Sequence, residues 1–529
     1  MDKEHLSDAI GNISDAHIEE ATQANKQKNR FPKMIGTAAA VIILAIAAVV
    51  LLPKLFPKNV TPDPTTNQNQ ETADATAKET ESAYAPETTM SEPVQNTTEA
   101  PPIPLRETGF SLIEADYPDG NDSYHISASE LEALYDYKRK DGWNDSPEFT
   151  KAILSAFLND SEENQVFSPF SLYQSLATLA EISSGNTRTQ ILDLLNASSI
   201  EELRKTAKAM WMNAYCDGSF FNEDDAERQS VIPSNSFWLN QTVDINGDAS
   251  VADILKNDYY TSFYKGDPAD EAFQEHYRKW LNDKTGGLLK DVVKEMSISP
   301  DTVFSLINTL YLKASWNDAF DEKDNTTAPF YGTNGTTNAE YMHNTYLGAW
   351  YYKGTHFSAV ALGTASTAGA WMILPDEGYS LSDLIGNAGY EELLLLLPDV
   401  DFNTFAPPEG YDLYEVDVSL PKFDVTGSYD LKDELIKLGV QDAFDVEKAE
   451  IPFVKARSGA NLCITDARQD VTLSVNENGI SASAITNMGG GFGDPIFYHV
   501  DFNMNRPFLM LVTTQCNTPL FAVAINTIQ

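Results

Sequence analysis

The sequence predicts an α+β fold in which helices dominate the first half of the folded region and strands the second. Apolar residues recur at helical spacing in 148–158, 171–182 and 428–440. Residues 301–316 are apolar on both alternating faces, which indicates a central strand covered on both sides. Because helices and strands are segregated along the chain, the pattern favours α+β over regular βαβ alternation. Further strands are expected at 370–375, 414–423, 471–475, 507–514 and 520–525.

Composition and charge limit the partners and the kinds of site that this chain can have. The chain has 529 residues, 42% of them hydrophobic, which suffices for a sizeable core. Its net charge of −42 repels phosphate backbones and heparin-like polyanions, so nucleic acid is not an expected partner. Cys216, Cys463 and Cys516 are far apart and odd in number, which argues against a disulfide framework or a cysteine zinc site.

The N-terminal region predicts a membrane anchor on a stalk. Residues 34–52 carry no charge and would form about 28 Å of helix, enough to cross a bilayer; a signal-peptide core or a buried helix is the alternative. More basic residues precede this span than follow it, which predicts a cytoplasmic segment at 1–33 and an extracellular C-terminal domain. Residues 53–107 are rich in Thr, Pro and Glu and predict a disordered stalk. The expected localisation is therefore a single-pass cell-membrane protein.

No motif of an enzyme stands out. We find no HExxH, GxSxG or GxxxxGK[ST] pattern, and the seven histidines have no evident Ser or Cys partners. The glycine-rich run at 489–493 is followed by Pro495 rather than by a helix start, so it is not a phosphate loop. The sequence predicts no catalytic residue, no cofactor and no metal ion.

Five segments, in order, resemble motifs of the serpin family. They include "QVFSPFSLYQSLATLAEISSGNTRTQIL" (165–192), "LINTLYLKASWNDAF" (306–320) and "VNENGISASAI" (475–485), with 418–444 and 505–512 completing the set. The resemblance covers about 147–529 and implies a domain at 108–529 with three β-sheets, about eight or nine helices and an exposed reactive-centre loop at about 477–500. A bacterial-type, membrane-anchored, monomeric member is expected.

The resemblance also implies irreversible suicide-substrate inhibition of serine proteases. The protease cleaves the loop and is trapped as an acyl-enzyme when the loop inserts into the large sheet. The hinge would comprise Glu477 and Gly479, and a period of two then directs one uncharged set of side chains inward: Ile480, Ala482, Ala484 and Thr486. Insertion would desolvate no charge. The alternative is a non-inhibitory serpin-fold binding module.

The position of the cleaved bond follows from counting along the loop. Seventeen residues from Glu477, the family's usual spacing, gives Gly493–Asp494. Phe492 and the Met488–Gly489 bond are the alternatives. Residues 476–505 contain no Lys or Arg, which disfavours trypsin-like targets. An elastase-like target is preferred, with subtilisin-like or chymotrypsin-like enzymes as alternatives.

Supporting positions carry over from the resemblance. Glu477 and Lys422 are similar to the salt-bridge pair where the loop enters the sheet. Gln469 stands where many animal members have His, which puts a His-dependent network below the sheet in doubt. The other positions expected to gate the sheet are Trp316, Asn308, Ser168 and Ser171.

Overall fold

The computed structural model describes residues 109–115, 117, 147–158, 161–216, 229–246, 249–287, 293–300, 302–366, 368–385, 392, 412–480, 498–514 and 518–528. All of them belong to the unit Asn96–Gln529. The segments 1–33, 34–52 and 53–107, for which an anchor and stalk are expected, lie outside the described residues. Within the described ranges, no helix has the length and apolar character needed to cross a membrane.

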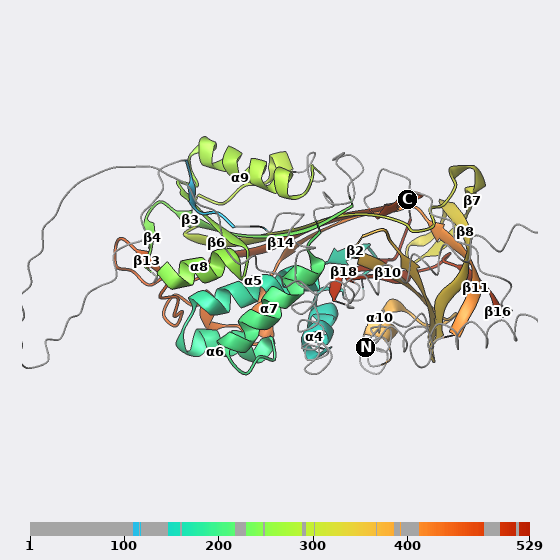
Figure 1. Ribbon diagram of the computed structural model, residues 1–529, viewed down its shortest axis with the longest axis horizontal. Coiled ribbons are helices and arrows are strands. Elements are labelled where there is room, and N and C mark those ends of the chain that lie inside the picture. Colours follow the sequence, from blue (N-terminus) through green and yellow to red (C-terminus); the bar gives the residue numbers. More distant parts are fainter. Residues whose placement is uncertain are drawn as a thin grey trace, which may run out of the picture. The chain divides into compact units, whose positions relative to one another are not determined.

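One layer of the fold is a seven-stranded sheet, to which the strands labelled β3, β6 and β14 in Figure 1 belong. Two of its three longest strands pair antiparallel at its centre. In spatial order the strands are β1 (Ser111–Ile113), β5 (Thr261–Gly266), β3 (Ser230–Asn240), β6 (Phe304–Ser315), β15 (Gly479–Ile480), β14 (Asp466–Asn476) and β12 (Phe423–Asp430). The two-residue strand β15 lies between β6 and β14, and the candidate functional site is built around it.

A nine-stranded sheet and a two-stranded sheet complete the β structure of the described residues. The spatial order of the larger one is β16 (Tyr498–Asn503), β11 (Asp412–Pro421), β8 (Gly335–Lys353), β9 (Phe357–Gly363), β10 (Ala368–Pro375), β17 (Phe508–Thr514), β18 (Pro519–Ile525) and β2 (Gln165–Phe167), with β7 (Thr326–Gly332) paired to β8. The smaller one joins β4 (Val243–Ile245) to β13 (Val454–Ala456).

Helices cover both faces of the seven-stranded sheet (Figure 1). Helix α9 packs on one face of β6 and α5 on the other. Every residue of α5 is buried, as expected for a helix that is apolar around most of its circumference. The α-helices are α4 (Pro147–Phe157), α5 (Pro169–Ile182), α6 (Gly185–Leu194), α7 (Ile200–Ala214), α8 (Ala249–Asn257), α9 (Glu271–Lys284), α10 (Leu381–Ile385) and α12 (Lys432–Lys437), and single 3₁₀ turns lie at Val293–Glu295, Glu322–Asp324 and Asp442–Phe444.

The predicted three-sheet, helix-rich α+β fold is confirmed, with eight α-helices among the described residues. The helix predicted at 428–440 is wrong at its start, because β12 continues to Asp430 and the helix begins at Lys432. The whole of β12 pairs with β14, and Tyr429 packs against Phe157 and Phe167. Strand pairing overrides the helical periodicity there.

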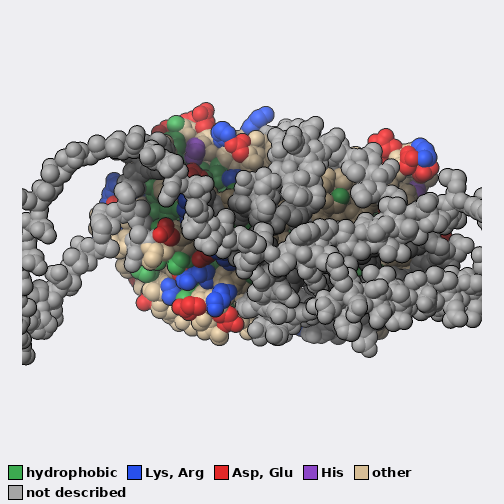
Figure 2. Space-filling model, in the orientation of Figure 1, with side chains coloured by type: hydrophobic (Ala, Val, Ile, Leu, Met, Phe, Trp, Pro, Cys, Tyr) green, Lys and Arg blue, Asp and Glu red, His purple; other side chains and the backbone are tan. Residues whose placement is uncertain are grey.

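Charged side chains of both signs lie beside one another on the described surface visible in Figure 2. Lys279 and Asp283 form an ion pair on α9, and Asp244 forms ion pairs with both Arg457 and Lys265. The hydrogen bonds from Arg457 and Lys265 lower the pKa of Asp244 to about 2. These pairs neutralise part of the acidic surface locally.

Candidate functional site

The candidate site is the seam between β6 and β14, which is closed at one end and open at the other. The two strands are parallel and pair directly through Ser305–Asn308 and Asp466–Gln469. At the other end β15 lies between them and pairs antiparallel with both. Between these two zones, residues 309–313 of β6 and 470–474 of β14 are not paired with each other in the described sheet. The seam is therefore a slot whose first two positions are filled.

Gly479 occupies the first position at the open end of this slot. Its φ is +150°, and a Cβ there would lie 2.1 Å from the carbonyl oxygen of Ala314 and 2.7 Å from Cα of Ser315. Both are backbone atoms of the neighbouring strand, so no side-chain rotation relieves the contact. Only glycine allows this close approach.

Ile480 is fully buried in the main hydrophobic core. It lies opposite Ala314 of β6 and Val475 of β14. The expected exposed loop at about 477–500 is thus too long at both ends, because Gly479 and Ile480 are in the sheet and residues 498–500 begin β16. Pairing with β6 sets the first limit and pairing with β11 sets the second, and both of these strands are distant in sequence.

Three backbone carbonyls just before β15 are held by hydrogen bonds. The indole Nε1 of Trp316 donates to the carbonyl of Asn476 at 2.9 Å. The backbone N–H of Trp316 donates to Asn478 at 3.0 Å, and that of Phe320 donates to Glu477 at 3.1 Å. Trp316 is itself buried and follows directly after β6. These bonds fix the turn that leads the chain into the slot.

A small ionic network surrounds Glu477 at the open end of the slot. Lys422 Nζ lies 3.0 Å from Oε1 of Glu477 and 2.8 Å from Oε1 of Glu340. Asn325 Nδ2 donates to the same Glu477 oxygen at 2.5 Å and to Glu340 at 2.9 Å. The Glu477 side chain is only 7% exposed. The sequence-predicted pair therefore lies together, but in a four-residue network.

The pKa shifts in this network define a pH range for its stability. Burial raises the pKa of Glu477, but hydrogen bonds from Asn325, its own backbone N–H and Lys422 outweigh burial, so the pKa is lowered overall. Burial lowers the pKa of Lys422, but its bonds to Glu340 and Glu477 raise it overall. A lowered carboxyl pKa contributes stability above about pH 4.3 that is lost as the pH falls through the folded value. A raised ammonium pKa contributes below about pH 10.4 and is lost as the pH rises through the folded value.

Ser168 and Gln469 fasten the closed end of the slot to helix α5. Ser168 caps the helix by accepting a hydrogen bond from the Ser171 N–H, and Pro169 follows as its first residue. The Gln469 amide pairs with the Ser168 backbone at both atoms: Oε1 accepts from the N–H at 2.8 Å and Nε2 donates to the carbonyl at 3.1 Å. Ser168 Oγ also lies 2.7 Å from the Leu520 carbonyl and 2.9 Å from Ser171 Oγ. Gln469 thus holds the start of helix α5 through two hydrogen bonds to the Ser168 backbone.

Asn308 and Thr309 line a small polar cavity at the closed end of the slot. Asn308 Nδ2 donates to Ser175 Oγ at 2.7 Å. Its Oδ1 and the Thr309 hydroxyl are buried and have no hydrogen-bond partner among the described residues. The cavity has a volume of about 10 Å³, close to the space that one water molecule needs. Two unsatisfied polar groups therefore lie where β6 and β14 first separate.

The remaining predicted loop positions lie outside the described residues. They are Ala482, Ala484, Thr486, Met488, Gly489, Phe492, Gly493 and Asp494. Sequence reasoning missed Asn325, Glu340 and Phe320. Glu340 lies in β8, whereas Phe320 and Asn325 lie in the segment that follows β6 and reach the hinge only in the folded chain. No local pattern distinguishes them, apart from Asn325 preceding Thr326 and Thr327 in a possible glycosylation triplet.

Comparison with known proteins covers the whole of this region. Residues 145–527 match the family model described as Serpin (serine protease inhibitor). Serine protease inhibitor 2 of Anopheles gambiae is 26% identical over 399 residues, which cover 72% of this chain and 90% of the relative. Serpin B9 of Homo sapiens is 25% identical over 362 residues, which cover 64% of this chain and 87% of the relative.

Solved structures agree in fold. The thermophilic serpin tengpin in its native state aligns with a TM-score of 0.61 and 21% identity, covering 79% of this chain and 96% of its own. Human thyroxine-binding globulin complexed with thyroxine aligns with a TM-score of 0.58 and 19% identity, covering 73% of this chain and 98% of its own. At these identities the likeness concerns the fold alone.

Proposed function

Because this chain belongs to the serpin family, we propose that it is an irreversible suicide-substrate inhibitor of serine proteases. The family is described as serine protease inhibitors, and the chain is not an enzyme. In the proposed reaction a protease attacks the loop and forms an acyl-enzyme, and loop insertion between β6 and β14 distorts the protease before deacylation. The protein would act as a monomer.

The observation that carries this proposal is the position of Gly479–Ile480 inside the seam. Continuing the antiparallel register of β15, residue 485 would lie between Thr309 of β6 and Asp470 of β14. Residues 481–485 thus match the open part of the slot in length. Thr486 would then reach Asn308 and Gln469, the first directly paired positions. Insertion beyond that point requires the direct β6–β14 pairs to separate.

The side chains of the loop suit this path. Ile480 is buried, so a period of two places Ala482, Ala484 and Thr486 on the same inward face. None of them is charged, so inserting them desolvates no charge. A solvent loop in a binding module needs no such uncharged face.

The proposed target class rests on the loop sequence. With no Lys or Arg in 476–505, an elastase-like enzyme cutting at Gly493–Asp494 is preferred. A subtilisin-like enzyme suits the same bond, and a chymotrypsin-like enzyme suits Phe492. Mass spectrometry of the released C-terminal fragment identifies the bond; a cut outside 488–494 would contradict this register.

Denaturing electrophoresis after incubation of the full chain with pancreatic elastase, subtilisin, chymotrypsin and trypsin tests the proposal. We expect a stable high-mass adduct with at least one of the first three and none with trypsin. The Ile480→Arg variant should be cleaved without adduct, because its charge would enter the buried seam. Val446→Arg, at a half-exposed position, is the matched control and should still form the adduct. Loop cleavage without adduct for every enzyme would favour the non-inhibitory binding module.

We further propose that the domain is tethered outside a membrane by residues 34–52 through the 53–107 stalk. The uncharged span and the basic residues preceding it support this layout. Expression in a bacterial host, followed by membrane fractionation and treatment of intact cells with a protease, tests it. Recovery of the full chain in the wash without detergent would refute the anchor. The bacterial-type assignment stays a prediction.

A further inference from the structure

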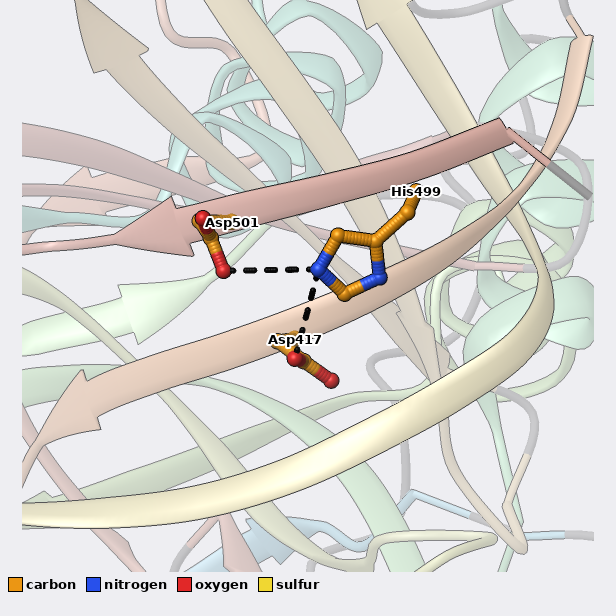
Figure 3. Close-up of side chains that lie close together, drawn as sticks. All are labelled: Asp417, His499 and Asp501. Carbon is orange, nitrogen blue, oxygen red and sulfur yellow. Dashed lines mark ion pairs between the residues drawn. The ribbon is translucent and has the colours of Figure 1, made fainter.

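The structure points to a divalent transition-metal site that joins β16 to β11, and we propose that it binds Zn²⁺ or an ion of similar chemistry. The residues are His499 and Asp501 of β16 and Asp417 of β11 (Figure 3). Their ligand atoms lie within 4.8 Å of one another. The proposal does not depend on the inhibitory function.

Strand pairing places the donors on one face of the sheet. In the parallel β11–β16 register, Glu415 lies opposite His499 and Asp417 opposite Asp501. These positions differ by two along each strand, so all four side chains share a face. The alternate positions Val416 and Phe502 are buried on the opposite face. The donor set is therefore presented to solvent by two paired strands.

The spacing around the imidazole suits a shared ion better than direct hydrogen bonds. His499 Nε2 lies 3.6 Å from Oδ2 of Asp417 and 3.5 Å from Oδ1 of Asp501. These separations exceed the usual N–H···O distance of about 2.7–3.2 Å. Ligands at about 2.0–2.2 Å from a tetrahedral Zn²⁺ are about 3.4 Å apart. An ion between the three groups needs only a small adjustment of side chains.

Two further contacts orient the donors as ligands are usually oriented. Thr345 Oγ1 donates to Oδ1 of Asp417 at 2.6 Å, which leaves Oδ2 facing the imidazole. Glu415 Oε1 lies 3.5 Å from Nδ1 of His499, on the side away from the ion position. At this distance Glu415 does not hydrogen-bond the ring, but it lies where a carboxylate is a common outer partner of a metal-bound His. By contrast, both ring nitrogens of His343 are within 3.0 Å of hydroxyl groups, which leaves them no free ligand position.

Charge supplies the second, independent argument. Asp417 and Asp501 are directly opposite each other on adjacent strands, an arrangement of like charges that is destabilising. With Glu415 nearby, three carboxylates surround one imidazole, which carries at most one positive charge. A divalent cation neutralises the excess. The nitrogen donor favours a transition metal over Ca²⁺, which prefers oxygen ligands.

Sequence analysis predicted no metal because these residues form no spaced motif. Asp417 lies in the second half of the chain before the loop, whereas His499 and Asp501 follow it. They meet only through the parallel pairing of β11 with β16. Because β16 begins directly after residues 481–497, an ion here would fasten the C-terminal root of the loop to the sheet.

Isothermal titration of the EDTA-treated, dialysed full chain with ZnCl₂ tests the site. We expect one saturable Zn²⁺ per chain and a higher Tm in its presence, because the ion binds the paired strands only when they are folded. CaCl₂ should neither give the same binding nor displace Zn²⁺. Glu415→Gln should weaken Zn²⁺ binding by about 10- to 100-fold.

The variants separate this site from general binding to an acidic surface. His499→Ala and Asp501→Asn should abolish the saturable binding and the rise in Tm. Because both side chains are at least half exposed, the metal-free Tm should not fall much in either variant, and it should rise slightly in Asp501→Asn, which removes the like-charge pair. His356→Ala removes another exposed histidine, which stacks on Tyr379, and should bind Zn²⁺ normally. Unchanged Zn²⁺ binding in His499→Ala, or no saturable binding in the unchanged chain, would overturn the proposal.

Discussion

Replacing Gly479 with alanine should expel β15 from the seven-stranded sheet. The new Cβ would lie 2.1 Å from the Ala314 carbonyl oxygen, well inside van der Waals contact. Both β6 and its partner β3 would have to move to accommodate it, since the contacted atoms belong to the backbone. Withdrawal of two residues from the seam disturbs far less structure.

The cost of Gly479→Ala is limited by what β15 contributes. Losing the burial of the Ile480 side chain costs about 1.5–3 kcal/mol, and each backbone hydrogen bond to β6 or β14 adds about 1 kcal/mol. Because β15 pairs with both strands, at least two such bonds are lost, and the free energy of unfolding should fall by about 3.5–5 kcal/mol. A larger fall is not expected, because the strand leaves before the full clash develops.

Hydrogen–deuterium exchange and denaturant unfolding measure this effect. Gly479→Ala should lose protection in peptides covering 309–316 and 471–480. Gly335→Ala is the matched control: its φ is +116°, but no atom lies within 4 Å of the added Cβ, so only backbone strain of about 1–2 kcal/mol applies. Unchanged protection of 471–480 in Gly479→Ala, together with a loss of stability no greater than in Gly335→Ala, would refute the reasoning.

Three further substitutions test the fastenings around the slot by denaturant unfolding. Lys422→Met leaves the buried Glu477 carboxylate without its ammonium partner and should cost about 1–3 kcal/mol at pH 7. The cost should shrink as the pH falls through the lowered pKa of Glu477, and a cost that does not change with pH would contradict the ionic argument. Gln469→Leu removes both side-chain partners of the Ser168 backbone and should cost about 2–4 kcal/mol, whereas a neutral result would mean that water replaces the amide. Trp316→Phe keeps an aromatic ring but loses the indole N–H donor, so a loss of about 1 kcal/mol is expected; no loss would show the bond to be unimportant.

Strands in this chain are predictable from sequence where both faces are buried. Residues 519–525 are continuously apolar, and residues 304–315 carry apolar side chains on both alternating faces; the structure places both segments inside sheets. Residues 428–430 were misleading because Tyr429 fits both a helical and a strand pattern. Its position was decided by partners more than 250 residues away, Phe157 and Phe167, which no local periodicity encodes.

The candidate site was predictable where a familiar motif fixes a position, and not where side chains meet across strands. Glu477 and Lys422 were paired by resemblance, and they lie 3.0 Å apart. Asn325 and Glu340 share the same network but sit in segments without a distinctive pattern. The engagement of Gly479 and Ile480 in the resting sheet is likewise a balance of burial and backbone pairing, which sequence alone does not decide.

The double contact between Gln469 and Ser168 has a consequence for acidic surroundings. An imidazole at this place would gain a proton between about pH 8 and pH 5, whereas a carboxamide does not ionise over that interval. The link between helix α5 and the centre of the sheet therefore keeps the same bonding pattern at pH 5 and pH 8. The Glu477 network at the open end loses its contribution only as the pH falls below about 4.3 and through the lowered pKa of that carboxyl. Stronger acid should therefore loosen the sheet at the Glu477 end while the bonds between Gln469 and Ser168 persist.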